Sequence, residues 1–190
     1  MVRRMNDEHL EFCGSEVWKS ALREHVLPFA LRDARLGGDV LEVGPGPGMT
    51  TDLLHVALPK LTVLELDERL ADALTKRLDG TNVDVVRGDA TAMPFEDARF
   101  TGAVSFTMLH HVPTTELQDR LFAEVARVLQ PGGVFVVSDS LASEELSAFH
   151  HDDVYNPVDP ATVETRFRAA GFADVEVRSN PYGWAAHGKR

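Results

Sequence analysis

Cysteine and basic residues are scarce in this chain, and both shortages limit what the protein can be. Cys13 is the one cysteine, so no internal disulfide can form. A lone cysteine is most often a small buried apolar group rather than a nucleophile. Nineteen Lys and Arg residues against thirty Asp and Glu residues give a net charge of −11, which repels phosphate backbones. We therefore expect no nucleic-acid partner.

Long hydrophobic runs are also missing from the sequence. No apolar stretch is long enough to span a membrane, and none follows a basic start as in a signal peptide. We therefore expect a cytoplasmic protein without a membrane span. A length of 190 residues with 44% hydrophobic residues is enough for one domain with its own core. The sequence predicts a single domain over residues 1–190.

Short apolar runs alternate with amphipathic stretches from Asp39 onward, which is typical of a parallel sheet with crossover helices. The expected strands span residues 39–43, 61–66, 83–87, 102–106 and 134–138, with two more near 175–178 and 182–186. The expected helices span residues 50–58, 68–78 and 116–129, and one more begins at Pro160 and ends at Gly171. The fold class is therefore α/β.

A glycine-rich turn joins the first expected strand to the first expected helix. Residues 41–48 read Leu-Glu-Val-Gly-Pro-Gly-Pro-Gly, so Gly44, Gly46 and Gly48 let the backbone turn sharply and bring its amide groups close to a ligand. A nicotinamide-binding turn would place its third small residue at position 49, which is Met49 here. The spacing predicts a nucleoside-cofactor site and disfavours a nicotinamide-dependent oxidoreductase.

Two acidic residues follow the next two strands at the same edge of the predicted sheet. Glu65 ends the second strand about 20 residues after Gly44, where a carboxylate can reach both ribose hydroxyls. Asp89 follows the third strand, where it can accept a hydrogen bond from an adenine amino group. Either acid alone would also suit a turn or a helix cap. Together with the glycine turn, they favour a nucleoside ligand.

The motifs taken in order resemble the class I S-adenosylmethionine-dependent methyltransferases, in the small-molecule branch that includes the ubiquinone and menaquinone methyltransferases. The resemblance rests on residues 40–48, Glu65, Gly88-Asp89-Ala90, Met93-Pro94-Phe95, Leu109-His110-His111 and residues 127–133. It implies a Rossmann-like, doubly wound, seven-stranded and mostly parallel sheet with an antiparallel edge strand. It also implies S-adenosylmethionine as the cofactor. One departure is Thr101, where the family pattern usually has Asp, and we expect it to affect local structure rather than chemistry.

The resemblance assigns roles to individual residues of the cofactor site. Gly44, Gly46 and Gly48 would pack on the methionine moiety and ribose, and Glu42 would help to place the amino group. Glu65 would hold the ribose, and Asp89 with Ala90 would hold the adenine. Leu66 and Phe106, near the ends of the second and fourth strands, complete the predicted cofactor-binding set. Within the single domain, we therefore expect four parts: an N-terminal helical cap (1–38), a cofactor-binding core (39–140), a possible lid (141–160) and a C-terminal helix with edge strands (161–190).

His110 and His111 are the candidate catalytic residues, because they follow the fourth strand where the methyl group should point. They can act as a base toward a small or medium-sized acceptor in an in-line displacement, or they can simply pack at the strand end. A protein that binds the cofactor without turnover is the alternative function.

The run His150-His151-Asp152-Asp153 contains metal-ligand residue types, but adjacent residues on a loop point apart. We therefore expect a solvated acidic loop and no metal site. The acceptor pocket is expected to form from the leading helix, the edge of strand four and residues 141–160, with Trp18 among its aromatic residues.

Overall fold

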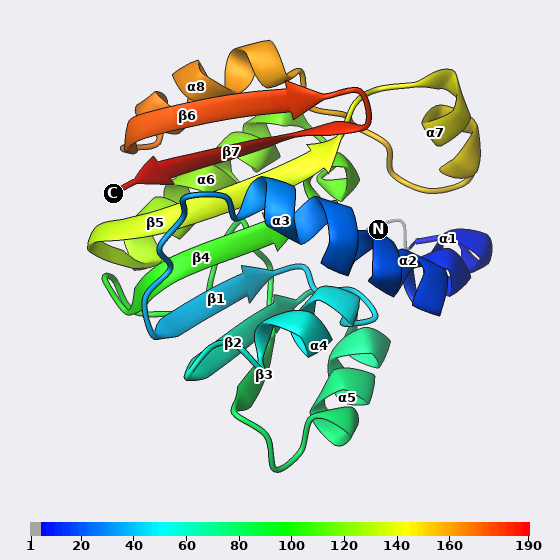
Figure 1. Cartoon of the computed structure of the whole chain (residues 1–190), viewed down its shortest axis with the longest axis horizontal. Helices are drawn as coiled ribbons and strands as arrows, with labels where there is room; N and C mark the ends of the chain where they lie inside the picture. The colour runs from blue at the N-terminus through cyan, green and yellow to red at the C-terminus, as the bar shows by residue number, and fades with distance from the viewer. Residues whose placement is uncertain (1–4) are drawn as a thin grey trace.

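Seven strands form one sheet in the computed structural model, which describes residues 5–190 (Figure 1). Residues 1–4 of the predicted N-terminal cap lie outside the described residues. The strands are β1 (Asp39–Val43), β2 (Lys60–Glu65), β3 (Val83–Arg87), β4 (Phe100–Phe106), β5 (Leu129–Ser140), β6 (Ala173–Asn180) and β7 (Gly183–Lys189). Their spatial order is β3-β2-β1-β4-β5-β7-β6.

The sheet is mostly parallel, and the predicted fold class is confirmed. Strands β1 to β5 pair in parallel, whereas β7 runs antiparallel to both β5 and β6. The antiparallel strand β7 therefore lies one place in from the edge, and β6 forms the edge itself. The strand order reverses between β1 and β4, and ligands of such sheets bind at this switch point, outside the carboxyl ends of the strands.

Helices cover both faces of the sheet, which defines the doubly wound arrangement. In Figure 1, α6 (Thr115–Val128) and α8 (Pro160–Ala169) lie behind the sheet, whereas α4 (Met49–Leu54) lies in front of it. α5 (Glu68–Arg77) shares a core with α4, because Leu54 and Leu74 belong to one buried cluster. Neighbouring strand residues alternate between the two cores: Leu41 and Phe135 pack on one side, and Val40 and Val136 on the other.

The segment ahead of β1 is helical, as predicted. It contains α1 (Asp7–Cys13), α2 (Glu16–Ala21), the π-helical η1 (Leu22–Val26) and α3 (Leu27–Ala30). Asn6 caps α1 by accepting from the backbone N–H of His9, and Ser15 caps α2 by accepting from that of Trp18. These caps place the apolar residues of both helices beside the carboxyl ends of the central strands.

The long connection after β5 contains the short helix α7 (Glu144–Phe149) and packs against α1. The Asn6 side chain donates hydrogen bonds to the backbone oxygens of Phe149 and His151 at 2.9 and 3.1 Å. Residue 156 anchors the other end of the connection, because its backbone N–H donates to the His110 oxygen at 2.7 Å. The predicted N-terminal cap and the possible lid over residues 141–160 thus contact each other.

Thr101 has the structural role that its departure from the family pattern predicts. Its hydroxyl accepts from the backbone N–H of Asp39 at 3.0 Å and lies 2.9 Å from the backbone oxygens of Leu36 and Asp39. These contacts join β4 to the chain that enters β1, at the amino end of the strands. The residue therefore lies at the opposite end of the sheet from the predicted cofactor site.

Candidate active site

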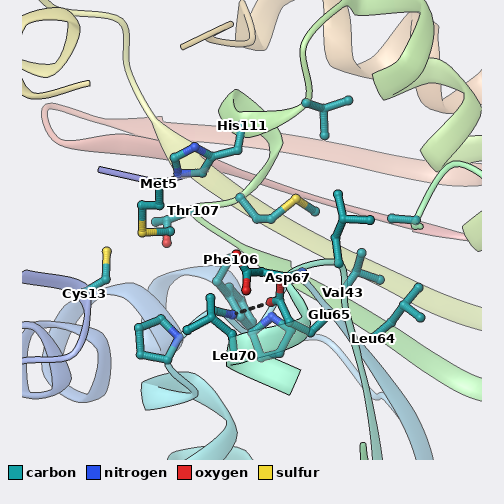
Figure 2. Close-up of a pocket in the computed structure, with 18 of the residues that line it drawn as sticks. Met5, Cys13, Val43, Leu64, Glu65, Asp67, Leu70, Phe106, Thr107 and His111 are labelled. Atoms are coloured by element: carbon teal, nitrogen blue, oxygen red, sulfur yellow. Dashed lines mark hydrogen bonds between the residues drawn. The ribbon is translucent and has the colours of Figure 1, made fainter. Parts of the chain in front are cut away.

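A cavity of about 490 Å³ lies at the carboxyl ends of β1 to β4. Its lining includes Gly44, Gly46, Glu65, Leu66, Asp89, Ala90 and Phe106 from the predicted cofactor-binding set. Figure 2 shows Met5 and Cys13 on one side of this cavity and Val43 and Leu64 on the other. The structure therefore brings together residues that are far apart in the sequence, at the switch point of the sheet.

The glycine turn forms the floor of the cavity through its first two glycines. Gly44 has φ +69°, and a Cβ at this position would overlap the Met108 side chain. Gly46 has φ +56°, and a Cβ there would meet no atom within 4 Å, so the backbone is open to a ligand. Both positions therefore require the conformational freedom that glycine has.

Gly48 does not line the cavity, and its contact with the cofactor stays a prediction. It is the N-cap of α4 with φ +87°, and a Cβ there would overlap the side chains of Leu74 and Arg77. The third glycine is needed because α4 and α5 approach each other closely. Spacing in the sequence could not distinguish this packing role from ligand contact.

Glu42 also lies outside the cavity lining, and its help in placing the cofactor amino group stays a prediction. The side chain is buried, and its carboxylate accepts hydrogen bonds from the hydroxyl groups of Thr50 and Thr51. Burial raises the pKa of Glu42 to about 7, although the two threonine hydrogen bonds oppose this shift. Glu42 therefore joins β1 to the start of α4, beneath the glycine turn.

Glu65 lies at the end of β2 with its carboxylate facing the glycine turn. One oxygen accepts from the backbone N–H of Gly46 at 3.0 Å, and the other accepts from that of Asp67 at 2.9 Å. Burial raises the pKa of Glu65, and these backbone hydrogen bonds partly counter the effect. The carboxylate fixes the turn from the side of the cavity, and its binding to ribose stays a prediction.

Asp89 and Ala90 follow β3, and both line the cavity. One Asp89 oxygen accepts from the backbone N–H and from the hydroxyl group of Thr91, both at 2.8 Å, while the residue is exposed. Leu66 is 46% exposed beside them, and Phe106 is buried at the end of β4. This end of the cavity thus combines two carboxylates with apolar surface, as a nucleoside needs.

His110 and His111 form the short helix η2 (Leu109–His111), directly after the turn that follows β4. His110 is absent from the cavity lining; its Nδ1 donates to Asp139 at 2.6 Å. Burial opposes the charged form, but the Asp139 carboxylate raises the pKa of His110. His111 lines the cavity, yet its Nδ1 lies 3.6 Å from Asp153 and its Nε2 is buried. The Nε2 atoms of both histidines are buried without a hydrogen-bond partner among residues 5–190, and the base role of either residue stays a prediction.

The loop 150–153 is solvated at His151 and Asp152 only, so the expectation of a solvated acidic loop was wrong for His150 and Asp153. His150 and Asp153 are 4% and 9% exposed, because the loop folds back against η2 and α1. Burial opposes ionisation of Asp153, but the nearby His111 and the hydrogen bond from His9 hold its pKa at about 2. The loop sequence alone could not reveal that His9 of α1 and His111 of η2 pack against Asp153.

The far wall of the cavity is mainly apolar. Leu10 and Cys13 from α1, Trp18 from α2 and Met108 after β4 contribute to this wall, and Trp18 was expected there. Cys13 is half-buried rather than buried, and desolvation still raises its pKa to about 12, so the residue stays a neutral thiol. Leu10 was not predicted as a lining residue. Leu10 and Cys13 are three residues apart, which places both side chains on one face of α1.

Within residues 5–190, no helix combines the length and the apolar composition that crossing a bilayer requires.

Comparison with known proteins identifies the family. Residues 41–137, about half of the chain, match the model of the methyltransferase domain. Phthiotriol/phenolphthiotriol dimycocerosates methyltransferase of Mycobacterium tuberculosis is 36% identical over 128 residues, which are 65% of this chain and 46% of that protein. The chain thus spans about half the length of this curated relative. Demethylmenaquinone methyltransferase of Clavibacter sepedonicus is 26% identical over 91% of this chain and 78% of its own length.

Solved structures confirm the fold. A methyltransferase from Aquifex aeolicus, described as dependent on S-adenosylmethionine, superposes with a TM-score of 0.75 at 16% identity, over 98% of this chain and 99% of that one. The predicted resemblance and the predicted cofactor are confirmed at the level of the family. The chain belongs to the methyltransferase domain family, in the class that uses S-adenosylmethionine.

Proposed function

We propose that this protein transfers the methyl group of S-adenosylmethionine to a small or medium-sized, largely apolar acceptor. The observation that carries the proposal is the cavity itself, which has a nucleoside-binding end and an apolar end. Gly46, Glu65 and Asp89 line the first end, whereas Leu10 and Trp18 line the second. The names of two relatives support an acceptor of this kind, because they refer to a demethylmenaquinone and to a phthiotriol dimycocerosate.

The residues of this chain contribute alignment and exclusion of water rather than acid-base chemistry. The cofactor supplies a methyl group on a sulfonium centre, which is already activated as a leaving group. Gly44 and Gly46 form the floor of the site, and the apolar wall formed by Met108 and Trp18 excludes water from the acceptor. Holding two reactants in line can by itself provide a large rate enhancement. The mechanism therefore needs no base from His110 or His111.

Replacing Glu65 by alanine tests the cofactor end of the cavity. The substitution removes the carboxylate that orders Gly46 and that we assign to the ribose, so we expect S-adenosylmethionine to bind about 10- to 100-fold more weakly. Isothermal titration calorimetry on both proteins measures this change. Glu164→Ala is the control, because Glu164 is exposed on α8 and pairs with Arg168. Equal affinity in the wild type and Glu65→Ala would remove Glu65 from the site.

Release of S-adenosylhomocysteine tests turnover. We expect release to require an acceptor and to be highest with apolar quinol-like or phenolic-lipid acceptors, because the far wall of the cavity is apolar. A panel of such compounds is compared with polar amines of similar size and with reactions that lack an acceptor. Tight cofactor binding without release in any reaction would favour the alternative, a protein that binds S-adenosylmethionine without turnover.

A further inference from the structure

Four histidines from three separate parts of the chain converge beside the cavity. His9 comes from α1, His110 and His111 from η2, and His150 from the C-cap of α7. One ring nitrogen of each lies within 4.8 Å of those of the other three. Figure 1 shows α1 and α7 beyond the same end of the sheet, the end toward which β4 and β5 point.

The Nδ1 atom of each ring faces an acceptor. His9 Nδ1 lies 3.1 Å from Asp153, and His110 Nδ1 lies 2.6 Å from Asp139. His150 Nδ1 donates to the backbone oxygen of residue 146 at 2.6 Å, and His111 Nδ1 faces Asp153 at 3.6 Å. A neutral imidazole that donates through Nδ1 has its lone pair on Nε2. The free nitrogen of each ring is therefore Nε2.

Three of these Nε2 atoms lack partners among residues 5–190. Those of His110, His111 and His150 are buried and make no hydrogen bond. An unsatisfied buried polar atom costs about 1 to 3 kcal/mol, so several such atoms around one point form an unusual arrangement. Three ring nitrogens that lie close together are therefore buried without a hydrogen-bond partner among residues 5–190.

Two buried carboxylates add negative charge to the cluster. Asp139 and Asp153 are 3% and 9% exposed, and within residues 5–190 their ion pairs are made with histidines alone. No Lys or Arg of the described chain lies within ion-pair distance of either carboxylate. Because a buried charge without compensation is costly, the cluster favours a ligand that carries two positive charges.

We propose that His9, His110, His111 and His150 bind one divalent transition-metal ion of the zinc class. Imidazole nitrogen is a preferred ligand of such ions, and four ligands satisfy tetrahedral coordination. Zinc-bound histidines commonly donate their other nitrogen to a carboxylate or a carbonyl, which is the pattern at Asp139, Asp153 and residue 146. Zinc bonds of about 2.1 Å place ligand nitrogens roughly 3.4 Å apart, so the nitrogens, which lie within 4.8 Å of one another, must approach by at most about 1.4 Å to complete the site.

The ion holds the acceptor side of the cavity in place. Four histidines fill all four positions, which is typical of a structural site. The site joins α1 and the end of α7 to η2. Its ligand His111 lines the cavity, and so does Asp153, which contacts two of the ligands. The metal therefore positions the wall that an acceptor would touch. Binding of the ion involves the protein alone, so the site does not depend on the proposed methyl transfer.

Zinc titration of the chelator-treated full chain, without S-adenosylmethionine, tests the site. We expect one zinc ion per chain in the wild type and at least tenfold weaker zinc affinity in His9→Ala and in His150→Ala. His151→Ala is the matched control, because His151 is adjacent to His150 but exposed and outside the cluster. Its zinc affinity should equal that of the wild type. Circular dichroism shows whether each variant is folded before titration.

Cobalt(II) gives a second measurement that needs no variant. Four nitrogen ligands in a tetrahedron give Co²⁺ intense visible absorption bands, so the metal-free wild type should turn coloured with one equivalent of Co²⁺, and zinc should remove the colour. Absence of stoichiometric zinc and cobalt binding in the folded wild type would overturn the proposal and leave a network of hydrogen-bonded histidines. Equal zinc affinity in all folded variants would overturn it as well.

Discussion

Valine in place of Gly44 should reduce the affinity for S-adenosylmethionine by at least about 100-fold, equivalent to about 2.7 kcal/mol. The backbone at Gly44 has φ +69°, a region that β-branched residues avoid. A Cβ at this position would also overlap the Met108 side chain, which itself lines the cavity. The turn must therefore shift away from the position in which its amide groups meet the ligand. Calorimetric titration measures the loss.

Gly80→Val is the matched control for this substitution. Gly80 has φ +75°, but a Cβ there would meet nothing within 4 Å, and the residue is exposed after α5. The control thus carries the same backbone strain without the overlap and far from the cavity. We expect it to lose stability and to keep its cofactor affinity. If folded Gly44→Val bound S-adenosylmethionine as tightly as Gly80→Val, the glycine turn would not be part of the binding site.

The central strands were predictable because their signal is local. β1 and β3 span the predicted residues, since each is a short run that is bounded by turn residues. β5 begins at Leu129. We expected it to begin at Val134, because Pro131-Gly132-Gly133 is typical of a break between elements. In the structure, Leu129 still pairs with Phe100 across this bend. Pairing between distant strands decides such boundaries, and composition does not reveal it.

The candidate site was predictable where function depends on the ends of neighbouring strands. Gly46, Glu65 and Asp89 meet in one cavity because parallel strands bring their carboxyl ends together. Gly48 and Glu42 belong to the same motif, but one packs helices and the other lies beneath the turn. The motif contains no information on which side of the turn faces the ligand.

The histidine cluster was not predictable from spacing. His9 and His150 are separated by most of the chain, and the contact between α1 and the segment after β5 brings them together. A metal motif with short spacing would have been recognisable, whereas this arrangement depends on tertiary contacts. The sequence gives one indication of such a cluster: histidines occur in both the leading helical segment and residues 141–160, which were expected to form the acceptor pocket.

The buried carboxyl group of Glu42 should make the stability of the protein fall as the pH rises. Burial raises its pKa from about 4.5 to about 7, so the folded state binds this proton more tightly than the unfolded state does. The contribution of Glu42 is therefore fully present below about pH 4.5 and is lost as the pH rises to 7 and above. The loss between pH 5 and pH 8 should be on the order of 2 to 3 kcal/mol.

Glu42→Gln separates this effect from every other titrating group. The amide keeps an oxygen for one threonine hydroxyl and an N–H group for the other, but it cannot ionise. Urea unfolding at pH 5 and pH 8 should therefore give similar stabilities for both proteins at the lower pH and a more stable variant at the higher pH. Glu164→Gln, an exposed substitution on α8, should follow the wild type at both values. If the wild type and Glu42→Gln changed equally with pH, the carboxyl group beneath the glycine turn would be ionised in the folded protein throughout, and its hydrogen bonds from Thr50 and Thr51 would outweigh its burial.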